Sequence, residues 1–344
     1  MDRAPSNAGS SPDSFSPDLE YDLDLDLAVK EIRERRAARV GLQAPEGLKR
    51  ALPAIARHIE VKTDAEVIIS GDPCYGACDM DTALCQEADL VIHLGHADLG
   101  SDHKNVIFLE ARRRDELRAV TLKAVSLLKE KRVGVATTVQ HIGQLGGALE
   151  VLKEHGIEGV LGPGKGRVRY PGQVLGCCYS SARQADAEEY LFIGTGRFHP
   201  LGISLATGKR VIAADPITGQ VAEIDPDPLL RRRFGAIARA AEAKRFAVLI
   251  SKKPGQRRMG LARRLKAAGE EKGKEMFLVY IDNIEPDRLL NLGAEAAVST
   301  ACPRIALDDA AKYGIPILTP PEFEVLVGKR QWEECGFDEI EQTD

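Results

Sequence analysis

The sequence predicts an α/β protein made of three similar small domains, each built on a parallel sheet. The main observation is a pattern that occurs three times: a basic residue, a short apolar strand, a polar loop and a helix. The strands that open it are expected at 38–42, 131–136 and 245–250. The length of 344 residues also exceeds what one ordinary core requires. Strands that alternate with helices form parallel sheets with right-handed crossovers.

Composition limits the classes of function. The chain is 44% apolar and 29% charged, which is typical of a soluble globular protein, and its net charge of -5 argues against direct nucleic-acid binding. No run approaches the roughly 18 apolar residues of a membrane span. Residues 1–26 are acidic and lack the apolar core of a signal peptide. We therefore expect a cytoplasmic protein without a membrane partner, in a compartment where structural disulfides are rare.

The first domain is assigned to residues 29–130. Residues 1–28 are expected to form a poorly ordered tail, because most of this segment is rich in Ser, Pro, Asp and Gly. A charged amphipathic helix is expected at 28–36. Further helices are expected at 48–59 and 81–87, and further strands at 67–70, 90–94 and 106–109.

The second and third domains are assigned to 131–243 and 244–344. Each boundary falls between a long charged helix and a new apolar strand. The third domain includes a C-terminal segment after residue 327, which we expect to be docked. The expected helices are 142–155 and 258–272, and the expected strands are 173–175, 190–193, 210–213, 276–281, 296–299 and 315–318. Basic runs at 112–114, 231–233 and 257–258 are interpreted as solvated helix faces or, alternatively, as docking sites for a protein substrate.

Five of the seven cysteines fall in loops that follow predicted strands. They are Cys74 and Cys78 after 67–70, Cys177 and Cys178 after 173–175, and Cys302 after 296–299. Open α/β sheets place their chemistry at the carboxyl ends of strands. Three domains around a pseudo-threefold axis could therefore each direct a thiolate to a common centre. Cys85 and Cys335 lie elsewhere, and packing or exposure accounts for them.

The spacing of these cysteines favours an iron–sulfur cluster over structural zinc. Structural zinc usually takes four ligands, often in close CxxC pairs, but no CxxC occurs and no His lies at zinc-knuckle spacing from a cysteine. A 4Fe-4S cluster is held by thiolates, and three of them leave one iron open for a substrate. The local CxxxCxxC pattern is absent because position 81 is Asp. Any ligands must therefore come from distant segments.

Several stretches together resemble a known enzyme family. The cysteine loops are YGACD at 75–79, LGC at 175–177 and ACPR at 301–304, and further matches are QAPEGL at 43–48, GTGRFHP at 194–200 and DNIEPDRL at 282–289. Over roughly residues 30–325 the sequence is similar to the archaeal enzymes for the first step of diphthamide synthesis, the 2-(3-amino-3-carboxypropyl)histidine synthase family.

The resemblance implies a transferase that acts as a homodimer of three-domain subunits. One 4Fe-4S cluster would be held by Cys78, Cys177 and Cys302, while Cys74 and Cys178 would not be ligands. The family belongs to the noncanonical radical enzymes that cleave the Cγ–S bond of S-adenosylmethionine. It releases 5′-methylthioadenosine and transfers the 3-amino-3-carboxypropyl group to a histidine of translation elongation factor 2. An electron donor is also implied.

Five residues are candidate contacts for S-adenosylmethionine. Gly194 and Gly196 follow the strand 190–193, where bare backbone could accept the ligand. His199, Gln256 and Arg304 lie in loops after predicted strands, and Arg304 could tune the cluster or hold a carboxylate. An ordinary turn is the more common explanation for Gly194 and Gly196. A structural histidine accounts at least as well for His199, and a solvated turn is the alternative for Gln256.

Three other functions compete with the diphthamide hypothesis. A quinolinate-synthase-like enzyme would use the open iron of a 4Fe-4S cluster as a Lewis acid on small carboxylates. A non-catalytic iron–sulfur sensor would expose its cluster and would not bind S-adenosylmethionine. A nucleotide-binding α/β protein would carry its cysteines incidentally. The stretches at 75–79 and 194–200 favour the diphthamide family.

Overall fold

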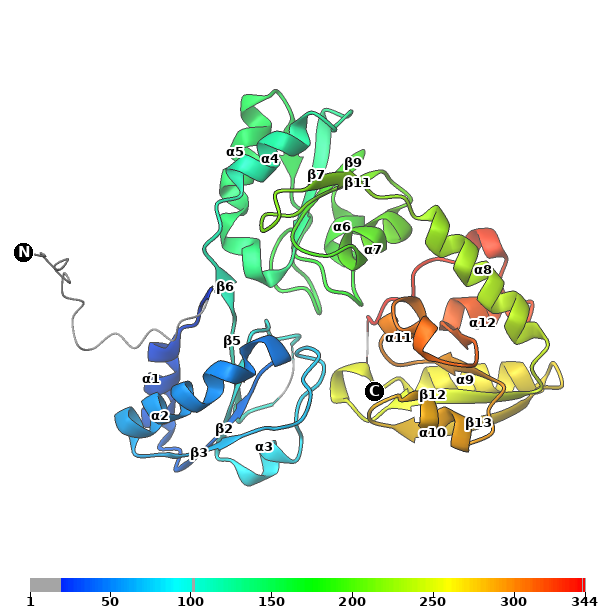
Figure 1. Ribbon diagram of the computed structural model, residues 1–344, viewed down its shortest axis with the longest axis horizontal. Helices are drawn as coiled ribbons and strands as arrows, with labels where there is room; N and C mark the ends of the chain where they lie inside the picture. The colour runs from blue at the N-terminus through cyan, green and yellow to red at the C-terminus, as the bar shows by residue number, and fades with distance from the viewer. Residues whose placement is uncertain (1–19, 101–102, 342, 344) are drawn as a thin grey trace, which may run out of the picture. The chain divides into compact units, whose positions relative to one another are not determined.

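A computed structural model describes residues 20–100, 103–341 and 343 (Figure 1). Residues 1–19 of the predicted tail lie outside the described part. Helix α1 (Leu25–Arg35) begins inside the segment 1–28, so the last residues of that segment are helical. The reason is local, because the Asp24 carboxylate accepts a hydrogen bond from the Leu27 amide at 3.0 Å and so caps the helix.

The described residues form three sheets of four or five strands that share one strand order. The orders are β3-β2-β4-β5, β8-β7-β9-β10-β11 and β13-β12-β14-β15. In each sheet the first of these strands in the chain lies between the second and the third, and all pairs among the first four are parallel. The predicted α/β class with several parallel sheets is confirmed. The shared order supports the internal repeat inferred from the sequence.

The first sheet belongs to a compact unit of residues 20–74, 81–96 and 103–111. Its strands are β2 (Arg39–Gln43), β3 (Glu66–Ile69), β4 (Leu90–Leu94) and β5 (Val106–Leu109), and the other elements are β1 (Tyr21–Asp22), η1 (Glu46–Ala51), α2 (Leu52–Thr63) and α3 (Leu84–Glu87). Central strand β4 is buried along its whole length, as expected for a parallel sheet covered on both faces. Helix α3 is shorter than predicted, because the chain before Leu84 forms a turn in which the Asp81 carboxylate accepts from the Leu84 amide at 2.9 Å.

The second sheet belongs to the other compact unit, which covers residues 75–80, 97–100 and most of the chain after 112. Its strands are β7 (Arg132–Thr137), β8 (Glu158–Val160), β9 (Glu189–Ile193), β10 (Val211–Ala214) and the antiparallel β11 (Val221–Glu223). Around them lie β6 (Arg112–Arg113), α4 (Arg118–Val125), η2 (Val139–Gln144), α5 (Leu145–Glu154), α6 (Ser180–Gln184) and α7 (Phe198–Thr207).

The predicted strand 173–175 is wrong. Only isolated bridges occur there, from Thr137 to Gln173 and from Leu175 to Cys178. The run is only three residues long, and Gly172 before it adopts a left-handed φ of 75°, so a ladder cannot extend. The second strand of this sheet is instead β8, which is too short to show an alternating pattern. Cys177 therefore lies in a long loop and does not directly follow a strand.

The third sheet lies in the same compact unit as the second. Its strands are β12 (Arg245–Ser251), β13 (Glu275–Ile281), β14 (Ala296–Ser299) and β15 (Ile317–Leu318). The helices are α8 (Asp227–Ala241), η3 (Pro254–Gln256), α9 (Met259–Glu270), α10 (Pro286–Asn291), α11 (Arg304–Leu307), η4 (Ala310–Lys312), α12 (Pro320–Leu326) and η5 (Trp332–Glu334). The domain boundaries near 130 and 243 remain a prediction.

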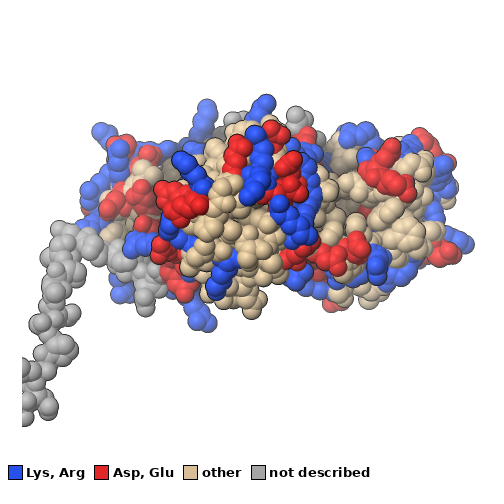
Figure 2. All heavy atoms as spheres, turned by 90° about the horizontal axis from the view of Figure 1, so that it is seen from above, with Lys and Arg blue, Asp and Glu red and all other residues tan. Residues whose placement is uncertain are grey.

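Two of the basic runs are not simply solvated faces. Arg233 of α8 is buried against Glu322 of α12, with an ion-pair distance of 2.6 Å. Arg258 is buried in the same way against Asp338 at 2.7 Å. On the face of the molecule shown in Figure 2, acidic and basic side chains are interspersed. Within the described residues, no helix combines the length and the apolar character needed to cross a bilayer.

Candidate functional site

The three predicted cluster cysteines come together in the second compact unit. Residues 75–80, which include Cys78, belong to that unit, whereas strand β3 before them belongs to the first compact unit. The thiols interact electrostatically: the charge on Cys78 raises the pKa of both Cys177 and Cys302. Burial is the larger cause for all three, and it raises the pKa of Cys302 to about 12.

The thiols of Cys78, Cys177 and Cys302 together have the chemistry of a binding site for a positively charged metal centre. Three neighbouring thiols whose pKa values are all raised by desolvation cannot ionise together at neutral pH unless positive charge compensates them. A bound metal supplies that charge and deprotonates its thiol ligands. The donor set therefore fits an iron–sulfur cluster, whose irons are held by thiolates.

Cys78 is held by the loop that follows β12. Gly255 donates its amide to the Cys78 carbonyl at 3.1 Å, and Gln256 donates from Nε2 to the Cys78 Sγ at 3.2 Å. A side chain at position 255 would place its Cβ 2.4 Å from the Cα of Cys78. Only glycine allows this close backbone approach.

The YGACD turn is braced by a buried ion pair. Asp79 accepts from the Tyr75 amide at 3.1 Å and pairs with Lys253 at 2.8 Å. Burial raises the pKa of Asp79, while hydrogen bonding to Lys253 opposes that shift. Lys253 also pairs with Asp282, the first residue of the DNIEPDRL stretch, at 3.0 Å. Two of the matched sequence stretches thus support the Cys78 loop.

Arg167 is a site residue that the sequence did not reveal. It is buried, donates from Nη2 to the Gly255 carbonyl at 2.8 Å, and lowers the pKa of the Cys78 and Cys177 thiols through its charge. Its Nε has no hydrogen-bond partner among the described residues. A buried donor of this kind normally finds an acceptor. Arg167 follows a glycine-rich loop of no specific spacing, so no local signal marked it.

The C-terminal segment connects the loops of Cys177 and Cys302. Ile340 donates its amide to the Cys177 carbonyl at 2.8 Å. Asp338 forms a bidentate ion pair with Arg258, in which Nη1 donates to Oδ1 at 2.8 Å and Nη2 donates to Oδ2 at 2.7 Å. Arg258 in turn donates to the carbonyl of Thr300, two residues before Cys302, at 2.7 Å. One short segment therefore orders two thiol loops.

The predicted S-adenosylmethionine contacts fall into different surroundings. Gln256 touches the Cys78 sulfur, as described above. Arg304 lies over the Phe198 ring at 4.8 Å, pairs with Asp308 at 2.9 Å, and lowers the pKa of Cys302. Phe198 also lies 3.2 Å from the position of a Cβ on Gly176, so Arg304 and the Cys177 loop share one aromatic contact.

His199, Gly194 and Gly196 lie around the start of α7. The His199 ring is stacked on Phe192, with centroids 5.8 Å apart, and burial lowers its pKa to about 4. Gly196 has a left-handed φ of 77° and is exposed, and among the described residues no heavy atom approaches its Cβ position within 4 Å. Gly194 is buried, and its amide bonds to the Ala214 carbonyl at 2.9 Å.

The remaining cysteines have other surroundings. The buried Cys178 donates from Sγ to the Ser180 hydroxyl at 3.3 Å. Cys85 and Cys335 are partly exposed. Cys74 belongs to a different group in the first compact unit, together with His93 and His96. Sequence reasoning missed that group because the two histidines are distant from the cysteine along the chain.

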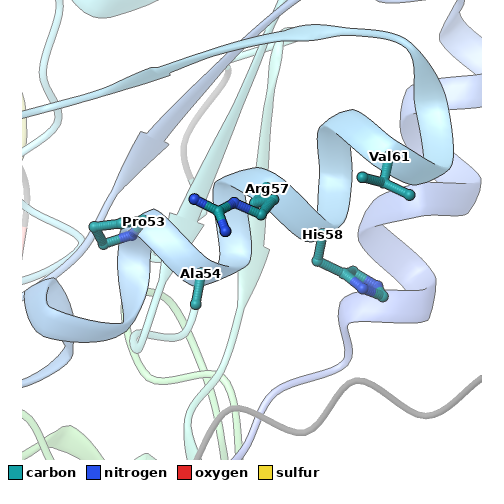
Figure 3. Close-up of a pocket in the computed structure, with 5 residues that line it drawn as sticks. All are labelled: Pro53, Ala54, Arg57, His58 and Val61. Carbon is teal, nitrogen blue, oxygen red and sulfur yellow. The ribbon is translucent and has the colours of Figure 1, made fainter.

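A shallow pocket of about 530 Å³ lies on the outer face of α2 (Figure 3). It is lined by Pro53, Ala54, Arg57, His58 and Val61. None of the predicted site residues lines it. The three thiols of Cys78, Cys177 and Cys302, and not this pocket, therefore form the candidate active site.

Comparison with known proteins agrees with this site. The profile of the family described as "Putative diphthamide synthesis protein" matches residues 44–336. The 2-(3-amino-3-carboxypropyl)histidine synthase of Pyrococcus horikoshii is 40% identical over 317 residues, covering 91% of this chain and 92% of that protein. The synthase of the same name from Methanocaldococcus jannaschii is 28% identical and covers 94% of both chains.

A solved structure is similar over nearly the same length. The crystal structure of Dph2 from Pyrococcus horikoshii with a 4Fe-4S cluster has a TM-score of 0.87 and 38% sequence identity, covering 93% of this chain and 94% of that one. The fold, the thiol loops and the sequence stretches thus lead to one conclusion: this chain belongs to the diphthamide synthesis family.

Proposed function

We propose that this protein is a 2-(3-amino-3-carboxypropyl)histidine synthase that carries out the first step of diphthamide biosynthesis. The observation that carries the proposal is the convergence of Cys78, Cys177 and Cys302 from distant segments in a chain similar to a cluster-bearing Dph2. Three ligands leave one iron of a 4Fe-4S cluster open for a substrate, which suits catalysis better than electron storage.

The proposed reaction exchanges one bond for another. The Cγ–S bond of S-adenosylmethionine breaks, and a bond forms from Cγ to the imidazole C2 of a histidine on translation elongation factor 2. The products are 5′-methylthioadenosine, the modified histidine and one proton. The cluster, held by the three cysteines, would supply the electron that initiates cleavage of the sulfonium.

The chain's own residues would orient the cluster and the substrate. The Gln256 amide donates to the Cys78 sulfur, which restrains one thiolate and helps to set its electron density. Arg167 offers a buried Nε–H donor next to the thiols. The α-carboxylate of S-adenosylmethionine would accept a hydrogen bond from this donor. Arg304, Gly194, Gly196 and His199 remain candidates for further contacts.

The proposed partners follow from the reaction. Elongation factor 2 is the protein substrate. An electron donor is needed to bring the cluster to its reduced form, whereas the bond exchange itself releases one proton and consumes no electron overall. We also propose that the active form is a homodimer in the cytoplasm, as the family resemblance implies.

The test is an anaerobic assay with reconstituted full-length protein, dithionite and S-adenosylmethionine. We expect 5′-methylthioadenosine and no 5′-deoxyadenosine, and with elongation factor 2 present we expect a 3-amino-3-carboxypropyl group on one histidine by mass spectrometry. Formation of 5′-deoxyadenosine would show cleavage at the other carbon–sulfur bond and contradict the proposal.

Matched cysteine variants test the ligand set. Cys78→Ala, Cys177→Ala and Cys302→Ala should each lose iron and product. Cys178→Ala and Cys335→Ala, which remove thiols outside the proposed set, should retain both. Loss of iron in Cys178→Ala with retention in Cys177→Ala would reassign that ligand.

A further inference from the structure

A second group of metal-ligating side chains lies in the first compact unit. Potential ligand atoms of Cys74, His93 and His96 all lie within 4.8 Å of one another. His93 Nε2 is 2.9 Å from His96 Nδ1 and 4.0 Å from the Cys74 Sγ. Cys74 and His93 are buried, and His96 is partly exposed. None of the three belongs to the proposed cluster ligands.

The backbone builds this group at the end of a central strand. His93 is on β4, which ends at Leu94, and His96 follows two residues later. Gly95 between them adopts a left-handed φ of 95°, which turns the chain so that the two rings meet. A Cβ at Gly95 would lie 3.1 Å from Pro45, so the turn also needs glycine for space. Cys74 arrives from the loop after β3.

A polar contact sets the orientation of the His93 ring. His93 Nδ1 is 3.1 Å from the Gln43 Oε1, and the Asp81 amide donates to the same oxygen at 3.2 Å. An oxygen that accepts from both sides places the proton of His93 on Nδ1. The lone pair of Nε2 then faces His96 and the thiol. Metal-bound histidines typically donate their other ring nitrogen to such an acceptor.

From this geometry we propose that Cys74, His93 and His96 bind a zinc-class divalent cation. Zinc with bonds of about 2.0 Å to nitrogen and about 2.3 Å to sulfur requires tetrahedral ligand atoms about 3.3 to 3.5 Å apart. The observed 2.9 and 4.0 Å differ from these values by about 0.5 Å, which small side-chain rotations supply. One thiolate and two imidazoles are ligands that zinc prefers. Binding displaces the thiol proton, and the fourth position is left for water or a further ligand.

The first test measures zinc and iron separately on the full-length, cluster-containing protein. After equilibration with zinc sulfate and removal of excess, we expect about one zinc per chain without loss of iron. Cys74→Ser and His96→Ala should lose zinc and keep iron, whereas Cys177→Ala should lose iron and keep zinc. Cys85→Ser and His58→Ala, which change a cysteine and a histidine elsewhere in the same unit, should keep both metals.

A second measurement does not depend on any variant folding. X-ray absorption at the zinc edge of the wild-type protein should show one sulfur at about 2.3 Å and nitrogen ligands at about 2.0 Å.

Gln43→Leu should weaken zinc binding by roughly 10- to 100-fold, because it removes the acceptor that orients the His93 ring. A zinc shell without sulfur, absence of zinc from the wild type, or iron loss in Cys74→Ser with zinc retained would each overturn the proposal.

Discussion

The side-chain amide of Gln256 donates a hydrogen bond to the sulfur of Cys78 across 178 residues of sequence, at a distance of 3.2 Å. This contact joins the loop after β12 to the YGACD turn. It also brings Gln256, a predicted S-adenosylmethionine candidate, into contact with a proposed cluster ligand. Hydrogen bonds to cluster sulfurs are among the factors that set a cluster's reduction potential.

Gln256→Leu should lower the reduction potential of the proposed cluster. A hydrogen bond to a thiolate contributes about 1 to 2 kcal/mol, and its full loss corresponds to at most about 40 to 90 mV for one electron. A redox titration followed by electron paramagnetic resonance measures this shift at unchanged iron content. Gln184→Leu, which alters an exposed glutamine on α6, serves as the control. An unchanged potential in Gln256→Leu would place the cluster away from Cys78.

Gly255→Ala should disturb the Cys78 loop. The added Cβ would lie 2.4 Å from the Cys78 Cα, and backbone atoms must move to relieve this overlap. We expect a loss of about 1 to 3 kcal/mol in unfolding free energy and lower iron incorporation. Gly314→Ala has no heavy atom within 4 Å of its Cβ among the described residues, so it should change stability by less than about 0.5 kcal/mol. Denaturant unfolding and iron analysis provide the readouts.

Arg167→Met should weaken S-adenosylmethionine binding. The buried guanidinium has an Nε without a partner in the described part of the chain, next to the Cys78 and Cys177 thiols. If it holds the substrate carboxylate, KM should rise by about tenfold or more, which corresponds to the loss of about 1.5 to 3 kcal/mol from a charged hydrogen bond. Arg169→Met alters a more exposed arginine that pairs with Asp98 and should leave KM unchanged. Equal KM values for all three proteins would exclude this role.

Asp338→Ala should strongly destabilise the second compact unit. Arg258 is buried, and the carboxylate of Asp338 neutralises it at 2.7 Å. Removing one partner of a buried ion pair costs about 3 to 5 kcal/mol, because the other charge remains uncompensated. Thermal unfolding measures the loss, with the exposed Asp287→Ala as control. A change below about 1 kcal/mol would mean that water reaches Arg258 easily.

His199 should make the protein less stable in mild acid. Burial, and then the charge of Arg304, lower the pKa of His199 in the folded protein to about 4, whereas an unfolded histidine titrates near about 6.5. Between these values the unfolded chain binds more protons, so the stability present above about pH 6.5 declines as the pH falls toward about 4. The loss by pH 4.5 is up to about 2.5 kcal/mol.

The comparison of His199→Gln with the wild type isolates this contribution. Unfolding free energies measured from pH 7.5 to pH 4.5 should fall less steeply in His199→Gln. His155→Gln, at the exposed end of α5, should keep the wild-type slope. Identical slopes in all three proteins would show that His199 is solvated in the folded state.

The elements that could be predicted are those with local causes. Strands such as Leu90–Leu94 are runs of apolar residues bounded by turns, and they occur where the sequence indicates them. The strand expected at 173–175 and the missing β8 show the limit, because elements of three residues carry too little periodicity to be recognised. Arg233 and Arg258 show another limit. The sequence of a basic run does not distinguish arginines that are solvated from arginines that pair with a buried carboxylate.

The sequence by itself determined the α/β class, the internal repeat and the family, because these depend on apolar periodicity and on short motifs whose residues are adjacent. Only the tertiary structure decided that Arg167, Gln256 and Gly255 surround Cys78, and that Cys74 lies beside His93 and His96. The physical reason is that side chains in such groups interact through space over a few ångströms. Their separation along the chain leaves no periodic or local pattern from which the contact could be inferred.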